Sequence, residues 1–171
     1  MGRIAPDKRY MVLMDVFQNL FSAIPGAQFV IVGRVADHEH FIRLQQRAQR
    51  SGIPIEFEIN VTDEKVREIL GQSQFYVGAK PYEHFGISIL EAVSAGCLPL
   101  VPDSGGQREI VPRELLRYNS PDQVAEKAAK LINDEDLRER TLAELRIHVQ
   151  SFKPERFFTE IETAVQQLLH R

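Results

Sequence analysis

The segment from Glu83 to Ser88 holds the residues of this sequence that are best suited to chemistry. Gly86 permits unusual backbone angles at the point where a loop would turn into a helix. The backbone N–H groups of Phe85, Gly86, Ile87 and Ser88 would then lie at the start of that helix, where they have no partner within it. Such groups bind anions, so the sequence predicts a site that holds a phosphate without a metal ion.

Two carboxylates bracket this turn, Glu83 before it and Glu91 one helical turn after its start. A carboxylate accepts hydrogen bonds from paired hydroxyl groups, which suits a sugar or a ribose. Because a carboxylate repels phosphate, we expect the two glutamates to face the ends of a ligand rather than its middle. The simpler alternative is an ordinary helix start, with Glu83 beside the helix dipole and Glu91 in solvent.

Two cations, Arg3 and Lys8, flank Pro6 near the beginning of the sequence. Placed near a diphosphate, they would stabilise its negative charge as it departs. Considered alone, they are equally typical of a solvated surface. The pair Gly105-Gly106 also has two interpretations, a place where backbone approaches a ligand or a simple turn.

The elements that must position these residues alternate along the chain. Apolar residues at helical spacing, with caps and turn residues, predict helices over residues 10–24, 38–51, about 62–72, and 87–95. Short β-rich runs predict strands over residues 28–32, 55–59, 75–79 and 98–101. Three further helices are predicted over residues 122–133, 135–149 and 154–169. This order predicts an α/β fold, a parallel sheet with helices on both faces, and ligands in such sheets bind beyond the carboxyl ends of the strands.

Length and composition narrow the class of protein. The chain has 171 residues, which fits one domain, and 43% of them are hydrophobic. The net charge of −3 argues against a nucleic-acid partner, and the single cysteine, Cys97, excludes an internal disulfide and a Cys-rich zinc site. No apolar run approaches the ~18 residues that a membrane span needs, so we expect a cytoplasmic domain. Because the pattern opens on a helix, we also expect a longer parent protein, through which alone a peripheral contact with a membrane would arise.

The segment 83–96, with the sequence EHFGISILEAVSAG, resembles the E-x7-E signature of retaining glycosyltransferases with the GT-B fold. Further residues continue the resemblance in register, namely Pro99-Leu100-Val101, Gly105-Gly106 and Glu109-Ile110-Val111. Gly2-Arg3 with Lys8 is similar to the family's phosphate-binding opening, and Val32-Gly33 is similar to a strand end of the family. The resemblance implies a Rossmann-like domain over residues 1–171, the C-terminal half of a GT-B enzyme, without the N-terminal domain that binds the acceptor.

The resemblance also implies roles for the residues at matching positions. Arg3 and Lys8 would hold the donor diphosphate, and Glu83 would contact sugar hydroxyls, so these three are the candidate catalytic residues. Glu91 would bind the ribose hydroxyls. The remaining donor-binding candidates are Phe85, Gly86, Ile87 and Ser88 for sugar and phosphate, Val61 near the base, and Gly33 at the strand end.

The function implied is transfer of a hexose from a nucleoside diphosphate sugar to an acceptor, with retention and without a metal or cofactor. The segment 83–99 is most similar to mannosyltransferases that use GDP-mannose, which favours that donor and leaves UDP-glucose or ADP-glucose open. The isolated chain is expected to be inactive. One alternative is a binding module for nucleotide sugars that performs no chemistry. Another, a dinucleotide oxidoreductase, is disfavoured because no G-x-G-x-x-G follows a strand.

Overall fold

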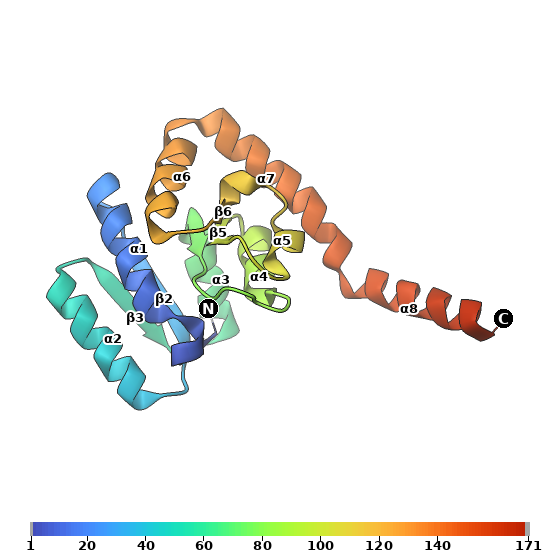
Figure 1. Ribbon diagram of the computed structural model, residues 1–171, viewed down its shortest axis with the longest axis horizontal. Coiled ribbons are helices and arrows are strands. Elements are labelled where there is room, and N and C mark those ends of the chain that lie inside the picture. Colours follow the sequence, from blue (N-terminus) through green and yellow to red (C-terminus); the bar gives the residue numbers. More distant parts are fainter. Residues whose placement is uncertain (1, 170–171) are drawn as a thin grey trace.

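The computed structural model describes residues 2–169, in which parallel strands alternate with helices (Figure 1). The strands are β1 (Arg3–Ile4), β2 (Phe29–Val35), β3 (Ile55–Ile59), β4 (Phe75–Val77), β5 (Leu98–Pro102) and β6 (Arg117–Tyr118). The α-helices are α1 (Tyr10–Ala23), α2 (His38–Ser51), α3 (Asp63–Gln72), α4 (Ile87–Ala95), α5 (Gln107–Ile110), α6 (Pro121–Asn133), α7 (Glu135–Val149) and α8 (Pro154–Leu169). Three short 3-10 helices, η1 (Pro6–Lys8), η2 (Glu114–Leu116) and η3 (Gln150–Phe152), complete the elements. The predicted α/β class is confirmed.

The strands form two parallel sheets of three strands each, in the orders β1-β2-β3 and β4-β5-β6. β1 pairs only with the carboxyl end of β2, where Arg3 pairs with Arg34 and Ile4 with Val35. Between β2 and β4 lies a cavity of about 650 Å³, lined by residues 29–32 of β2, all of β4, and apolar side chains of α1. The predicted sheet is therefore divided into two halves within the described residues.

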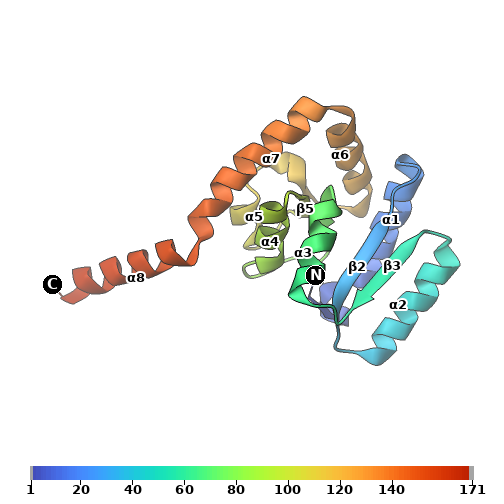
Figure 2. The same cartoon turned by 180° about the vertical axis from the view of Figure 1, so that it is seen from behind.

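Helices cover the sheets and join the two halves. α1 packs against α2 and α6, and these helices are in front in Figure 1. α3 packs against α4, and α4 against α7; Figure 2 brings α3 to the front. The core is built from aliphatic side chains that are fully buried, among them Ile4, Leu44, Leu100 and Leu131. Burial on both faces explains why the central strands read as short apolar runs rather than as alternating patterns.

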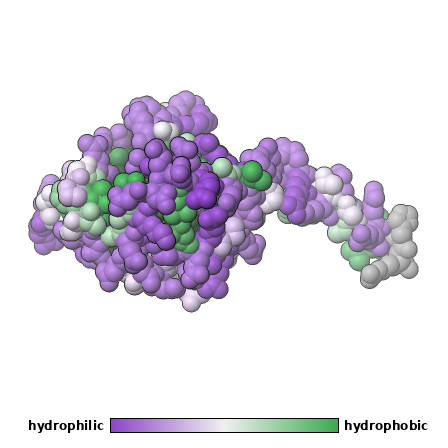
Figure 3. All heavy atoms as spheres, turned by 90° about the horizontal axis from the view of Figure 1, so that it is seen from above, coloured by the Kyte–Doolittle hydropathy of each residue, from purple (hydrophilic) through white to green (hydrophobic). Residues whose placement is uncertain are grey.

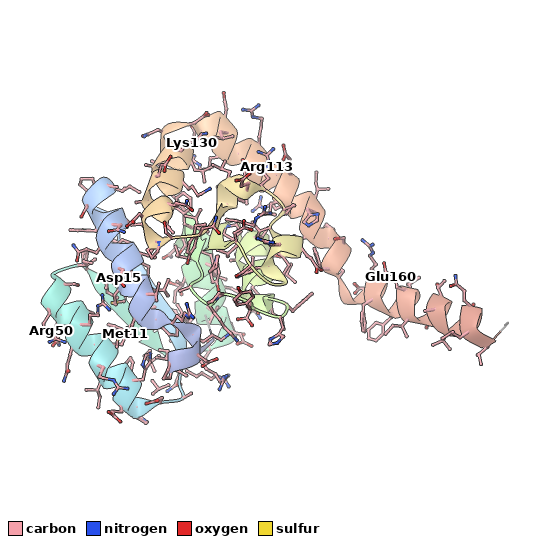
Figure 4. All side chains as sticks on the ribbon, in the orientation of Figure 1. Met11, Asp15, Arg50, Arg113, Lys130 and Glu160 are labelled. Atoms are coloured by element: carbon pink, nitrogen blue, oxygen red, sulfur yellow. The ribbon has the colours of Figure 1, made fainter. Side chains whose placement is uncertain are left out.

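Arginine side chains add links between neighbouring elements, and Figure 4 labels three of the residues that take part, Met11, Asp15 and Arg113. Arg47 of α2 donates to the Met11 carbonyl oxygen of α1 at 3.1 Å and forms an ion pair with Asp15. Arg113, which precedes η2, forms an ion pair with Glu144 of α7. Such exposed pairs add little stability each, so the apolar core carries the fold.

The predicted element bounds hold for most helices and fail at the shortest elements. The helices 38–51, 87–95, 135–149 and 154–169 begin and end as predicted. β2 continues through Gly33 to Val35, beyond the predicted end at residue 32, and β4 ends at Val77 rather than residue 79. β1, β6 and α5 were not predicted, because elements of two to four residues carry no hydrophobic period.

Helix α8 projects from the body of the molecule, as Figures 1 and 3 show. Its apolar residues Phe157, Phe158, Ile161, Val165 and Leu168 are exposed, so they do not cover the core of the described chain. Within residues 2–169, no helix combines the length and apolar character that crossing a membrane requires.

We expect Leu131→Ala to lower the free energy of unfolding by about 2–5 kcal/mol, because Leu131 is a fully buried residue of α6, a helix that packs against α1. The matched control is Leu168→Ala, at a side chain that is 70% exposed on α8, for which we expect a change within about 0.5 kcal/mol. Urea denaturation followed by circular dichroism measures both values. Equal effects of the two substitutions would contradict this picture of the core.

Candidate functional site

Gly86 adopts a left-handed conformation, with φ of 95°, and is the N-cap of α4. Its carbonyl oxygen accepts the first helical hydrogen bond, from the N–H of Ile89 at 2.9 Å. A side chain at Gly86 would lie 2.8 Å from the Ile89 side chain in addition to adopting a strained φ, so the position requires glycine. The amides of Ile87 and Ser88 belong to the first turn of α4, where backbone N–H groups have no acceptor within the helix. The predicted turn at the start of this helix is confirmed.

The loop that carries Glu83 rests on the segment 104–107. The Ser104 hydroxyl accepts from the Tyr82 N–H at 3.0 Å, and the Gly106 N–H donates to the Glu83 carbonyl oxygen at 2.9 Å. A Cβ at Gly106 would lie 2.1 Å from the His84 carbonyl oxygen. Because Gly105-Gly106 has no side chains, the backbone of this segment packs directly against the backbone of the loop that carries Glu83.

Lys8 and Glu83 form an ion pair, with Lys8 Nζ 2.7 Å from Glu83 Oε2. Lys8 closes η1, which follows β1, whereas Glu83 lies in the loop after β4. Both side chains are about three-quarters buried, with 26% and 22% of their surface exposed. The two halves of the molecule therefore meet through opposite charges at the carboxyl edge of the strands.

A second lysine, Lys80, shares the same carboxylate. Its Nζ lies 3.6 Å from Glu83 Oε1 and 3.9 Å from Asp7 Oδ2. Asp7 is in turn 3.5 Å from an Arg3 guanidinium nitrogen. The cluster thus holds three cations and two carboxylates in one chain of contacts, so it retains a net positive charge that suits an anionic ligand.

The environment of Glu83 favours its ionised form. Partial burial alone would raise the pKa of its carboxyl group, but the hydrogen bond and charge of Lys8 oppose this. The charge of Lys80 and the His84 backbone N–H add to that effect, and together they hold the pKa of Glu83 below its ordinary value. At neutral pH Glu83 is therefore an acceptor of hydrogen bonds and not a proton donor.

Tyr76 of β4 lies behind this cluster. Its hydroxyl is 3.0 Å from the Ser88 hydroxyl, which fixes the Ser88 side chain. Burial raises the pKa of Tyr76, the Ser88 hydrogen bond opposes the rise, and the charges of Glu83 and Glu91 add to it.

The structure brings together some of the predicted site residues and leaves others apart. Lys8, Glu83, Gly86 and Ser88 line a common cavity of about 40 Å³, enough for a water molecule or two. Arg3 is connected to Glu83 through Asp7 and Lys80. Phe85, Ile87 and Glu91 are exposed on the first turns of α4 and its preceding loop.

Gly33 and Val61 do not line this cavity. Gly33 is buried in β2, where a Cβ would lie 2.5 Å from the Gly2 carbonyl oxygen, so close packing against β1 already explains the glycine. Val61 follows β3 by two positions, and the intervening Asn60 donates its N–H to the Gly33 carbonyl oxygen at 3.0 Å. Both lie at the carboxyl end of the first sheet, and their roles in donor binding, including that of Val61 near the base, stay predictions.

Sequence reasoning did not identify Lys80, Tyr76 or Gln107 as site residues. Gln107 is buried and donates from Nε2 to the Lys80 carbonyl oxygen at 3.2 Å, which holds the loop in place. The position of Lys80 three residues before Glu83 was the only available signal for it. For Gln107 the sequence gives no signal, because nothing distinguishes a glutamine that becomes buried from one that stays exposed.

Other reactive groups in the described residues do not contribute a second centre. Cys97 is buried, and burial raises the pKa of its thiol to about 11, so it is not a nucleophile at neutral pH. No three His, Cys, Asp or Glu side chains within residues 2–169 cluster in a way that could hold a metal ion.

Comparison with known sequences shows the family to which this chain belongs. The family described as "Glycosyl transferases group 1" matches residues 1–145. The GPI3 subunit of phosphatidylinositol N-acetylglucosaminyltransferase from Saccharomyces cerevisiae is 30% identical over 131 residues, which are 73% of this chain and 27% of that protein. GDP-mannose:cellobiosyl-diphosphopolyprenol alpha-mannosyltransferase from Xanthomonas oryzae pv. oryzae is 28% identical over 147 residues, 80% of this chain and 38% of that protein. The chain thus spans well under half the length of these relatives.

A solved structure shows the same fold. The C-terminal domain of a group 1 family glycosyltransferase (LpcC) from Francisella tularensis superposes with a TM-score of 0.75 at 22% identity, covering 88% of this chain and 82% of that one. The fold is that of the C-terminal domain of GT-B glycosyltransferases. The match over residues 1–145 establishes that the chain belongs to the group 1 glycosyltransferases.

Proposed function

We propose that this chain binds the donor of a retaining glycosyltransferase, a nucleoside diphosphate hexose, and that a further domain supplies the acceptor. The observation that carries the proposal is the meeting of Lys8, Glu83 and the start of α4 around one cavity. Cationic groups and helix amides recognise phosphate, and an ionised carboxylate beside them recognises hydroxyl groups.

In this proposal the diphosphate lies between the cations and the first turn of α4. Lys8 and Arg3 bind its oxygens, and the amides of Ile87 and Ser88 donate to it. The same groups stabilise the negative charge that grows on the diphosphate as the bond to the sugar breaks. Because Glu83 is ionised, it accepts hydrogen bonds from the sugar hydroxyls and orients the ring.

The two ends of the donor extend from this centre. Glu91, exposed one turn into α4, accepts from the ribose hydroxyls, and the base lies toward Val61 and Gly33 at the end of the first sheet. Phe85 and Gly86 approach the sugar from the loop. A mannosyl donor is favoured because the segment 83–99 resembles enzymes that use GDP-mannose and because several relatives are named for that donor, the Xanthomonas oryzae enzyme among them. No metal or cofactor takes part in this scheme.

Titration calorimetry with guanosine, GDP, UDP and ADP tests the proposed anion site. We expect GDP to bind more tightly than guanosine by at least tenfold, because charge-assisted hydrogen bonds contribute about 1.5–3 kcal/mol each. UDP and ADP show how far the base matters. We also expect weak binding overall, since only one side of the ligand is covered. Equal affinity for guanosine and GDP would refute the phosphate site, and with it the function.

Single substitutions test the contacts to the diphosphate and to the ribose separately. We expect Arg3→Ala to weaken GDP binding roughly three- to tenfold and to leave guanosine binding unchanged, because an exposed guanidinium contributes less than a buried one. Glu91→Ala should weaken both ligands by about tenfold, since both carry the ribose. Arg50→Ala on α2 and Glu162→Ala on α8 are the controls and should change neither. If Glu91→Ala affected only GDP, the ribose assignment would be wrong.

A further inference from the structure

The carboxylate of Glu83 has a different lysine at each oxygen. Lys8 Nζ lies 2.7 Å from Oε2, and Lys80 Nζ lies 3.6 Å from Oε1. The two lysines come from separate parts of the molecule, because Lys8 ends η1 and Lys80 lies on the same loop as Glu83. The backbone of that loop is fixed, since the buried Gln107 donates to the Lys80 carbonyl oxygen.

This arrangement raises a difficulty for ligand binding if Lys8 is to hold a phosphate. In the ligand-free protein Lys8 and Glu83 neutralise each other. A phosphate that takes Lys8 would leave a largely buried carboxylate without that partner, and removing one member of a buried pair is costly. A carboxylate in such surroundings tends to take up a proton, after which it would no longer accept two hydroxyl groups.

We propose that Lys80 is a positioning residue that becomes the counter-ion of Glu83 when Lys8 moves to the donor diphosphate. The inference rests on the proposed function for the movement of Lys8. The Lys80 side chain is 26% exposed and begins 3.6 Å from Glu83, so it needs only a small rotation of its flexible stem to form the closer contact. Glu83 then stays ionised and in place while the ligand is bound.

The other charged and titratable groups around Glu83 do not supply this partner. Asp7, from η1, lies 3.9 Å from Lys80 and 3.5 Å from Arg3, and its side chain is 45% exposed, so water solvates it when Lys80 turns away. Tyr76, from β4, stays neutral because burial raises the pKa of its hydroxyl, which bonds to Ser88. From α4, Glu91 is a like charge. His84 contributes its backbone N–H, which carries no charge of its own.

An experiment without ligand isolates the effect of Lys80 on the pKa of Glu83. The pKa of Glu83 is measured by NMR of ¹³C-labelled glutamate carboxyls in wild type, Lys8→Met, Lys80→Met and the double variant. In Lys8→Met, which imitates the departure of Lys8, we expect the pKa to stay near or below its ordinary value. In the double variant we expect it to rise by about one pH unit or more, and restoring a cation with Lys80→Arg in the Lys8→Met background should reverse that rise.

The matched control is Lys65→Met, which removes a lysine that lies 3.0 Å from Glu68 on exposed α3 and should leave Glu83 unchanged. If the pKa of Glu83 rose as far in Lys8→Met as in the double variant, Lys80 would not be its second counter-ion. Because no ligand is present, this outcome would overturn the inference without bearing on the proposed function.

A second experiment tests the exchange itself with inorganic pyrophosphate as the probe. Calorimetry at pH 6 in two buffers of different ionisation enthalpy counts the protons taken up on binding. Pyrophosphate itself exchanges protons near this pH, so the two proteins are compared with each other. We expect Lys80→Met to take up more protons than wild type, because Glu83 loses Lys8 and has no replacement. Equal proton counts in the two proteins would overturn the exchange. Failure of wild type to bind pyrophosphate would refute the diphosphate site instead, and the ligand-free pKa values would still decide the role of Lys80.

Discussion

The candidate site depends on one electrostatic contact, the ion pair between Lys8 and Glu83. It joins the turn after β1 to the loop after β4 and thereby fixes the distance between the two groups that would bind the phosphate and sugar of a donor. The pair is largely buried, so solvent screens it less than the exposed pairs elsewhere on the molecule. A net positive cluster results, in which one carboxylate nevertheless stays ionised.

Backbone packing makes this contact possible. The loop that carries Glu83 lies directly on Gly106, where any side chain would collide with the His84 carbonyl oxygen. Gln107 and Ser104 hold the same loop by hydrogen bonds. Gly86 then turns the chain into α4 at a φ that other residues rarely adopt. Three glycines, 86, 105 and 106, thus determine where the carboxylate and the helix amides point.

The sequence was informative where a pattern is long or a residue type is nearly obligatory. Helical periodicity located α2, α4, α7 and α8, and the glycine at position 86 located the start of the site helix. Strands of two residues, such as β1 and β6, are specified by their neighbours and could not be predicted from period. The same applies to Lys80 and Gln107. Their importance arises from contacts between loops that are distant in the chain, and a single lysine or glutamine does not reveal such contacts.

The divided sheet gives the site a mechanical property. No strand pairing joins β2 to β4 in residues 2–169, and the cavity between them leaves the two sheets linked chiefly by helix packing and by side chains at the site. Lys8 follows β1 of the first sheet, and Glu83 follows β4 of the second. An anion that draws Lys8 toward α4 would therefore link the two sheets. The domain would then be stiffer when the site is occupied than when it is empty.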